Sequence, residues 1–173
     1  DFLAWNTFSR KNNIIMNIEH YCNKGLVDWS NITLQEFLEE YEPPFWKKVF
    51  NNCKDIIPEI SELLKIYAKK HIIYPPMPFV FNAMDHIKPS EIKVVIIGQD
   101  PYINEGEAMG MSFSVPDKIK IPLSLVNIYK ELKNEGYKGY ENMKSGNLTC
   151  WTEKGVFLYN ICLTVNKGES GSH

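Results

Sequence analysis

The sequence predicts an α/β fold built around a parallel sheet, and three observations lead to that prediction. Two short apolar runs, at residues 94–97 (Val-Val-Ile-Ile) and 156–159 (Val-Phe-Leu-Tyr), have the composition of buried strands. A helical pattern of apolar residues lies between them, from residue 124 to residue 132. Strand, helix and strand in this order favour parallel pairing of the two strands. With 173 residues, the chain is long enough for one domain with its own core.

The first part of the chain differs from the rest. Residues 1–42 include an Asn-rich patch and match no pattern of the domain that follows, so we interpret them as an N-terminal extension of unknown role. Within them, Thr33-Leu34-Gln35-Glu36 has the pattern of a capping box that begins a short helix. We place a boundary at Tyr41-Glu42-Pro43-Pro44, which leaves residues 43–173 as the main domain.

The main domain begins with helical segments. Residues 58–70 predict a helix whose apolar residues Ile60, Leu63, Leu64 and Tyr67 lie on one face. The proline-rich residues 74–78 predict an extended, stiff connection to the strand at 94–97.

A loop with glycines follows that strand, and a further helix follows the loop. Ser124 stands where it could cap this helix, whose buried stripe we expect to be Leu125, Ile128, Tyr129 and Leu132. A short helical turn around Trp151 ends at Gly155 and leads into the strand at 156–159.

Composition limits the classes of function. The net charge is −2 with a pI near 6.1, and Arg10 is the only arginine, so broad phosphate binding and arginine readout of guanine are disfavoured. An enzyme that touches few phosphates around one nucleotide remains compatible. The four scattered cysteines predict reduced core residues and no metal site. We see no membrane-spanning run or signal peptide, and we expect an intracellular protein in the nucleus, the cytoplasm or a viral replication compartment.

Polar side chains follow both predicted strands. Asp100 comes after Gly98 and Gln99 and is held by Pro101, and a carboxylate there could orient and deprotonate a water. A turn or cap aspartate is the ordinary alternative. Asn160 follows the second strand, and its amide could donate to and accept from the edge of a base, or simply satisfy a turn.

Two aromatic residues and one serine complete the candidates. Tyr102 and Phe113 are planar side chains suited to a flat pocket for a base, although Phe113 could also be a core strand residue. Ser124 could present its hydroxyl to a DNA phosphate or act only as the helix cap.

These motifs, in this order, resemble the family 1 uracil-DNA glycosylases, enzymes that excise uracil from DNA. The resemblance covers about residues 43–173 and is most specific at Lys93 to Tyr102. Further matching segments are residues 73–76, 80–83, 110–115, 124–132, 155–160, 163–165 and 171–173. It implies a central parallel four-stranded sheet flanked by helices, which this chain would contain only in part, being incomplete at its C-terminus.

The resemblance also implies a role for each candidate. Asp100 would activate the attacking water, and the Gln99 backbone would bind uracil and stabilise negative charge on its O2. Tyr102 would stand against C5 and exclude thymine, Phe113 would stack on the flipped base, and Asn160 would read its edge. The family uses no metal or organic cofactor. The implied partners are uracil-containing DNA, single- or double-stranded, and a proteinaceous glycosylase inhibitor, with the enzyme as a monomer.

Two departures from the family pattern stand out. Ile103-Asn104 replaces the usual His-Gly, and the chain has no His-Pro-Ser segment, whose histidine bonds the departing uracil. His173 corresponds to a different family histidine. We therefore expect these residues to be part of a longer protein. Two alternatives stay open: an inactive glycosylase-like scaffold that binds DNA or protein, and an unrelated α/β enzyme that binds a free nucleotide.

Overall fold

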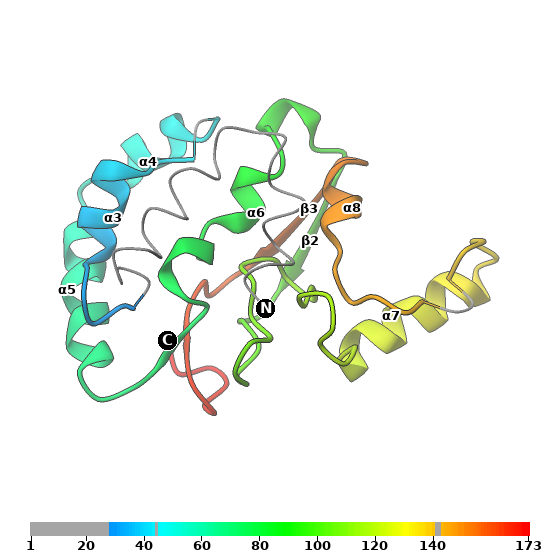
Figure 1. Ribbon diagram of the computed structural model, residues 1–173. Coiled ribbons are helices and arrows are strands. Elements are labelled where there is room, and N and C mark those ends of the chain that lie inside the picture. Colours follow the sequence, from blue (N-terminus) through cyan, green and yellow to red (C-terminus); the bar gives the residue numbers. More distant parts are fainter. Residues whose placement is uncertain (1–27, 44, 141–142) are drawn as a thin grey trace.

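The computed structural model describes residues 28–43, 45–140 and 143–173, in which short helices surround two small sheets (Figure 1). Residues 1–27, which make up most of the predicted N-terminal extension, lie outside the described residues. In chain order the elements are α3 (Leu34–Glu40), α4 (Lys47–Cys53), α5 (Ile57–Ala68), β1 (Ile73–Tyr74), a 3₁₀ helix (Met77–Phe79), α6 (Asn82–Asp85), a 3₁₀ helix (Pro89–Glu91), β2 (Val94–Gly98), α7 (Leu123–Asn134), α8 (Thr149–Thr152), β3 (Val156–Asn160) and β4 (Val165–Asn166).

The predicted parallel pairing is confirmed. β2 and β3 form a parallel two-stranded sheet in which Val94 pairs with Val156 and Gly98 with Asn160. In Figure 1 this pair runs through the middle of the molecule, with α3, α4 and α5 on one side of the view and α7 on the other. The second sheet is a short antiparallel pair of β1 with β4. Among the described residues, two strands of the expected four-stranded parallel sheet are present.

The prediction that the strand at 94–97 is buried is wrong for this chain. Val95 and Ile97 are 51% and 62% exposed, whereas Phe157 and Leu158 of β3 are buried. Among the described strands β2 pairs with β3 alone, so its other edge and much of its apolar surface have no neighbour there. The β-branched composition correctly predicted a strand, because that preference does not depend on which elements cover the strand.

The capping box is confirmed at α3, where the Thr33 hydroxyl accepts from the Glu36 N–H at 3.1 Å and the Glu36 carboxylate accepts from the Thr33 N–H at 2.8 Å. The helix packs into the common core through Phe37. Trp29 is also buried there and donates to the Pro75 carbonyl at 2.8 Å. The boundary at residues 41–44 stays a prediction.

Most of the apolar face predicted for the next helix is exposed. Of its four residues in α5, only Leu64 is buried, while Ile60, Leu63 and Tyr67 are exposed. The inner face instead includes Ser61, whose hydroxyl accepts from the Gln35 N–H of α3 at 2.7 Å. A small polar side chain allows this close approach between the helices, and apolar periodicity alone could not identify it.

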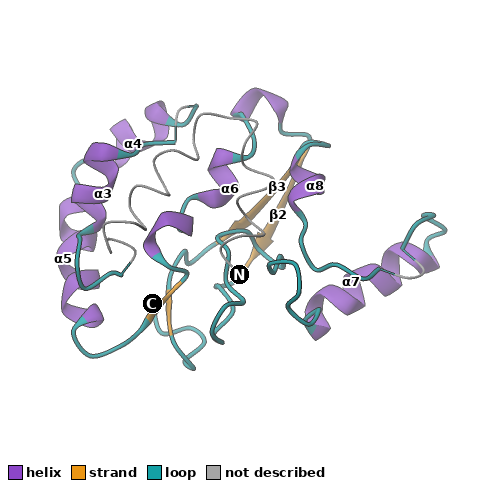
Figure 2. Cartoon of the chain, viewed as in Figure 1, coloured by secondary structure: helices purple, strands orange, loops and turns teal. Residues whose placement is uncertain are grey.

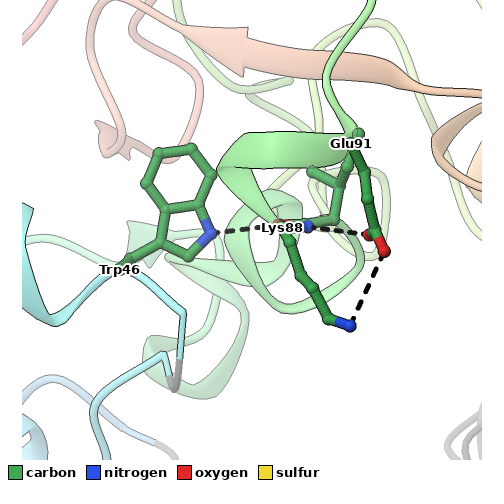
Figure 3. Close-up of polar contacts among 4 residues, drawn as sticks. Trp46, Lys88 and Glu91 are labelled. Atoms are coloured by element: carbon green, nitrogen blue, oxygen red, sulfur yellow. Dashed lines mark hydrogen bonds and ion pairs between the residues drawn. The ribbon is translucent and has the colours of Figure 1, made fainter.

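Trp46 anchors the connection that leads into β2. Its indole N–H donates to the carbonyls of Met84 and Ile87, at 2.9 and 3.1 Å, and its ring stacks on Phe157 of β3. Figure 3 shows this indole beside the turn from Lys88 to Glu91. In this turn the Glu91 carboxylate accepts from the Lys88 N–H and pairs with the Lys88 ammonium group at 3.6 Å. The turn places the start of β2 next to β3.

Other local expectations need correction. The connection after Tyr74 is extended only as far as Pro76, because a 3₁₀ helix begins at Met77. Helix α7 begins at Leu123, with Pro122 at the cap position, so Ser124 lies in its first turn and is not the cap. The predicted stripe of α7 holds in part, since Leu125 and Tyr129 are buried and Ile128 and Leu132 half-buried.

Three of the four cysteines lie in the described part of the chain. Cys53, Cys150 and Cys162 are free thiols, but Cys53 and Cys150 are exposed, so the expectation of core cysteines is wrong for these two. No described helix has the length and hydrophobicity needed to cross a membrane.

Candidate functional site

A cavity of about 280 Å³ opens at the carboxyl ends of β2 and β3. Figure 2 shows that mostly loops surround the ends of β2 and β3. Side chains on such loops can converge on one point without being part of the sheet. All six predicted site residues line this cavity: Gln99, Asp100, Tyr102, Phe113, Ser124 and Asn160. The parallel register explains the convergence, because Gly98 and Asn160 are paired and both strands end there.

Asp100 is half-buried and is held by two donors from the C-terminal loop. The Ser170 hydroxyl and the Gly171 N–H each donate to its Oδ2 at 2.7 Å. Asp100 therefore does not cap a helix or close a local turn, since its partners lie about 70 residues away. A carboxylate fixed through one oxygen keeps acceptor capacity on the other, which suits it to orient a water.

Tyr102, Phe113 and Ser124 form one connected group. The Tyr102 hydroxyl donates to the Phe113 carbonyl at 3.1 Å and lies 3.1 Å from the Ser124 hydroxyl oxygen. Because the Tyr102 proton goes to the carbonyl, Ser124 is the donor in the second contact. Burial raises the pKa of Tyr102, and the hydrogen bond from Ser124 opposes that rise, so the phenol is neutral at physiological pH.

Phe113 lies in a turn and not in the core strand that was its alternative. Its backbone φ is +63°, in the left-handed region that a bulky side chain rarely adopts. Such a conformation persists where neighbours hold it, and the hydrogen bond from Tyr102 to its carbonyl is one such restraint. The turn directs the half-buried ring to the cavity that Tyr102 also lines.

Asn160 places a carboxamide against the end of β2. The residue is only 7% exposed, yet its side chain makes no hydrogen bond with the residues that the structure describes. A Cβ atom on Gly98 would lie 2.2 Å from Asn160 Oδ1, so the glycine at this strand end leaves the space in which the amide lies. The donors and acceptor of this buried amide are thus available to a ligand in the cavity.

The opposite wall of the cavity is the segment from Met109 to Phe113, and α6 supports it. Asn82 donates its side-chain N–H to the Met109 carbonyl at 2.7 Å, and the Ala83 N–H donates to the Gly110 carbonyl at 3.1 Å. Gly110 has a φ of +74°, and a Cβ there would lie 1.7 Å from the Phe79 carbonyl oxygen. Only glycine allows the wall to approach this closely.

Sequence reasoning missed several of these contributors. Ser170 and the Gly171 backbone contact Asp100, but nothing local in the sequence marks them as partners of a residue so distant. Gly98 was noted only as the end of a strand. Asn82 lies in a segment that carries the family resemblance, which was the one available signal for it.

His173 lies outside the lining of the cavity, in the loop that carries Ser170. Its Nε2 is 3.0 Å from Asn166 Oδ1 and its Nδ1 is 2.7 Å from the Thr164 hydroxyl. Since an amide oxygen only accepts, Nε2 is the protonated nitrogen. The His173 side chain therefore contacts Asn166 and Thr164 and does not line the cavity.

Comparison with known proteins then relates this geometry to a family. Residues 84–173 match the model of the uracil DNA glycosylase superfamily. The chain belongs to the uracil-DNA glycosylase superfamily. The matched region includes β2, α7 and β3, which carry residues of the cavity, and all six candidate residues. The α/β class predicted from the sequence agrees with this membership, and the four-stranded sheet stays a prediction.

Relatives of this glycosylase superfamily match both the sequence and the fold. The uracil-DNA glycosylase of Dichelobacter nodosus is 46% identical over 131 residues, which are 74% of this chain and 57% of that protein. The crystal structure of mimivirus uracil-DNA glycosylase has a TM-score of 0.74 at 34% identity, over 82% of this chain and 53% of that chain. A mimivirus UNG Y322F structure in complex with UGI has a TM-score of 0.71 at 36% identity, over 75% and 51% of the two chains. This chain thus spans about half the length of the relatives it matches.

Proposed function

We propose that the full-length natural protein carrying these residues is a uracil-DNA glycosylase. It would hydrolyse the N-glycosidic bond of uracil in DNA, as a step of base-excision repair. The observation that carries this proposal is the shared cavity at the strand ends, lined by a carboxylate, a carboxamide and two aromatic side chains. Membership of the uracil-DNA glycosylase superfamily supports it. A base must leave the duplex stack to enter such a cavity.

In this reaction Asp100 is the residue that activates water. Its Oδ2 is occupied by Ser170 and Gly171, which leaves Oδ1 for the water that attacks the sugar carbon C1′. As the C–N bond breaks, negative charge moves to the uracil ring. The Gln99 backbone would bind uracil and stabilise charge at its O2, because donors placed where charge develops lower the barrier.

Recognition of the base would fall to three residues. The Asn160 carboxamide would donate to uracil O4 and accept from N3–H, a pair of bonds that cytosine cannot reproduce at its amino group. Phe113 would stack on the ring, and Tyr102 would stand at C5, where the methyl group of thymine would collide. The hydrogen bond from Tyr102 to the Phe113 carbonyl supports this assignment, because it holds the two rings in a fixed relation.

Ser124 would contact a DNA phosphate beside the cavity. Its hydroxyl proton is engaged by Tyr102 in the free protein, so a direct bond from the hydroxyl to phosphate requires this contact to break. Phosphate binding by Ser124 would then compete with its hydrogen bond to Tyr102, the residue that rejects thymine. No metal or organic cofactor is part of this proposal.

The wider properties follow from the same assignment. We propose that β2 and β3 belong to a four-stranded parallel sheet, in which the exposed apolar residues of β2 are covered. The partners would be uracil-containing DNA, single- or double-stranded, and a proteinaceous inhibitor, for which the UGI complex of a mimivirus relative is the support. We further propose an intracellular monomer.

A second function has one observation in its favour. Ile103 lines the cavity where the family pattern has a histidine, and an aliphatic side chain cannot hydrogen-bond a water. An inactive scaffold that binds DNA without excision would fit this change.

Uracil release distinguishes the two functions. Single-stranded oligonucleotides containing one uracil, thymine or cytosine would be incubated with the full-length natural protein, and free base and abasic sites measured. Release from the uracil strand alone supports the glycosylase. Binding of that strand without release supports the scaffold.

A further inference from the structure

We propose that Ser170 is a positioning residue for Asp100: its hydroxyl holds Oδ2 of the carboxylate so that Oδ1 faces the cavity. This inference rests on the proposed role of Asp100. Ser170 and Asp100 both line the cavity, and the two side chains are joined at 2.7 Å. The second donor, the Gly171 N–H, reaches the same oxygen at 2.7 Å. Oδ1 accepts no hydrogen bond from any residue that the structure describes.

The loop that carries Ser170 is attached to the rest of the molecule on both sides of the serine. The Gly168 N–H donates to the Ile103 carbonyl at 3.0 Å, and the Lys167 ammonium pairs with Glu105 at 3.1 Å. Beyond the serine, the Ser172 hydroxyl accepts from the Asn166 N–H at 2.8 Å. The loop is therefore held by contacts other than the bond to Asp100, and these contacts determine where Ser170 lies.

The two donors to Asp100 differ in what a substitution can remove. The Gly171 N–H belongs to the backbone and persists in any side-chain variant. The Ser170 hydroxyl is a separate, removable donor, and hydrogen bonds to an ionised carboxylate are stronger than neutral ones. Its loss leaves the carboxylate held at one point, so that the group can rotate away from the orientation that the reaction needs.

One kinetic consequence follows for the full-length natural protein. For Ser170→Ala we expect kcat for uracil release to fall about tenfold while KM changes less than about twofold, because orientation is lost but DNA contacts are not.

Two further variants separate positioning from loop structure. Ser170→Thr keeps a hydroxyl and should retain kcat. Ser172→Ala removes a hydroxyl from the same loop without touching Asp100, so kcat should stay within about twofold of the native value even if the protein becomes less stable.

The outcomes also separate this inference from the proposed function. If Asp100→Asn abolishes release while Ser170→Ala leaves kcat unchanged, the positioning role of Ser170 is overturned and the function stands. An equal fall of kcat in Ser172→Ala would overturn it as well. If Asp100→Asn retains full activity, the proposed role of Asp100 fails first.

Discussion

Gly98 shows how much of the site depends on single residues. It ends β2 opposite Asn160, and a Cβ at this position would lie 2.2 Å from the Asn160 oxygen and 2.9 Å from the Ser112 Cβ. The carboxamide can therefore occupy its place only because β2 ends in glycine. A similar dependence holds across the cavity, where Gly110 approaches the Phe79 carbonyl.

Gly98→Ala should accordingly displace the Asn160 amide. We expect kcat/KM for uracil release to fall about 100-fold, because a displacement of about 1 Å in a recognition group has an effect of this size. Steady-state kinetics with a uracil-containing oligonucleotide measures it. Ile97→Val is the matched control in the same strand, at a side chain that does not line the cavity. Activity within about twofold of the native protein in Gly98→Ala would contradict this account of the strand end.

Single residues were also where the sequence was most informative. The position of Gln99, Asp100 and Asn160 at the cavity could be predicted because they directly follow strands whose composition is distinctive. Ser170 could not, because its contact with Asp100 spans 70 positions and depends on the path of an irregular loop. The donor role of the Ser124 hydroxyl also required the position of Tyr102, since the sequence allowed a simple helix cap.

At the scale of elements, α3 and α6 are joined by a buried pair of side chains. The Tyr41 hydroxyl, directly after α3, donates to the Asp85 carboxyl group at the end of α6. Burial raises the pKa of Asp85 to about 7, and the hydrogen bond from Tyr41 opposes only part of that rise. Burial also raises the pKa of Tyr41, so the phenol keeps its proton. Because α6 supports the wall of the cavity, this pair affects the site indirectly.

The titration of Asp85 predicts a dependence of stability on pH. The folded state binds this proton more tightly than the unfolded state, in which the pKa of Asp85 is near 3.8. The unfolding free energy therefore falls as pH rises from about 4 to about 7 and then levels off. Asp85→Asn is neutral throughout and keeps an oxygen for Tyr41. The difference in unfolding free energy between variant and native protein should therefore grow in favour of the variant, by about 4 kcal/mol between pH 4 and pH 8. Urea unfolding at several pH values measures it, and parallel curves would refute the assignment.

The elements themselves were predictable to different degrees. The capping box of α3 and the pairing of β2 with β3 follow from local patterns, and both were predicted correctly. The inner face of α5 was not predicted correctly, because its buried residues are Ser61 and Leu64. The burial of the serine depends on the position of α3, which local patterns do not contain. Helix α7 begins two residues earlier than predicted, since Pro122 occupies the cap position that Ser124 was expected to fill.

At the scale of the whole molecule, the exposure of β2 is the main departure from the prediction. The strand has the composition of a buried strand, yet Val94, Val95 and Ile97 are each more than half exposed. Composition reports the environment for which a strand is suited, whereas exposure depends on the elements that surround it. The proposed four-stranded sheet reconciles the two observations.

Ile97→Thr in the full-length natural protein tests the proposed sheet. If further strands cover β2, this substitution places a hydroxyl in a core and removes apolar contact, and the unfolding free energy should fall by roughly 2 kcal/mol. Chemical denaturation measures the change. A loss below about 0.5 kcal/mol, as expected for an exposed side chain, would contradict the four-stranded sheet.

The most direct test of the central claim is uracil release by Asp100→Asn in the full-length natural protein. Single-turnover excision from a uracil-containing single strand would be measured alongside binding of the same strand. The account predicts that release falls at least about 100-fold while binding stays within about threefold, because the amide keeps the shape of the side chain but cannot act as a base. Release at the native rate by Asp100→Asn would contradict the claim that this carboxylate activates the water.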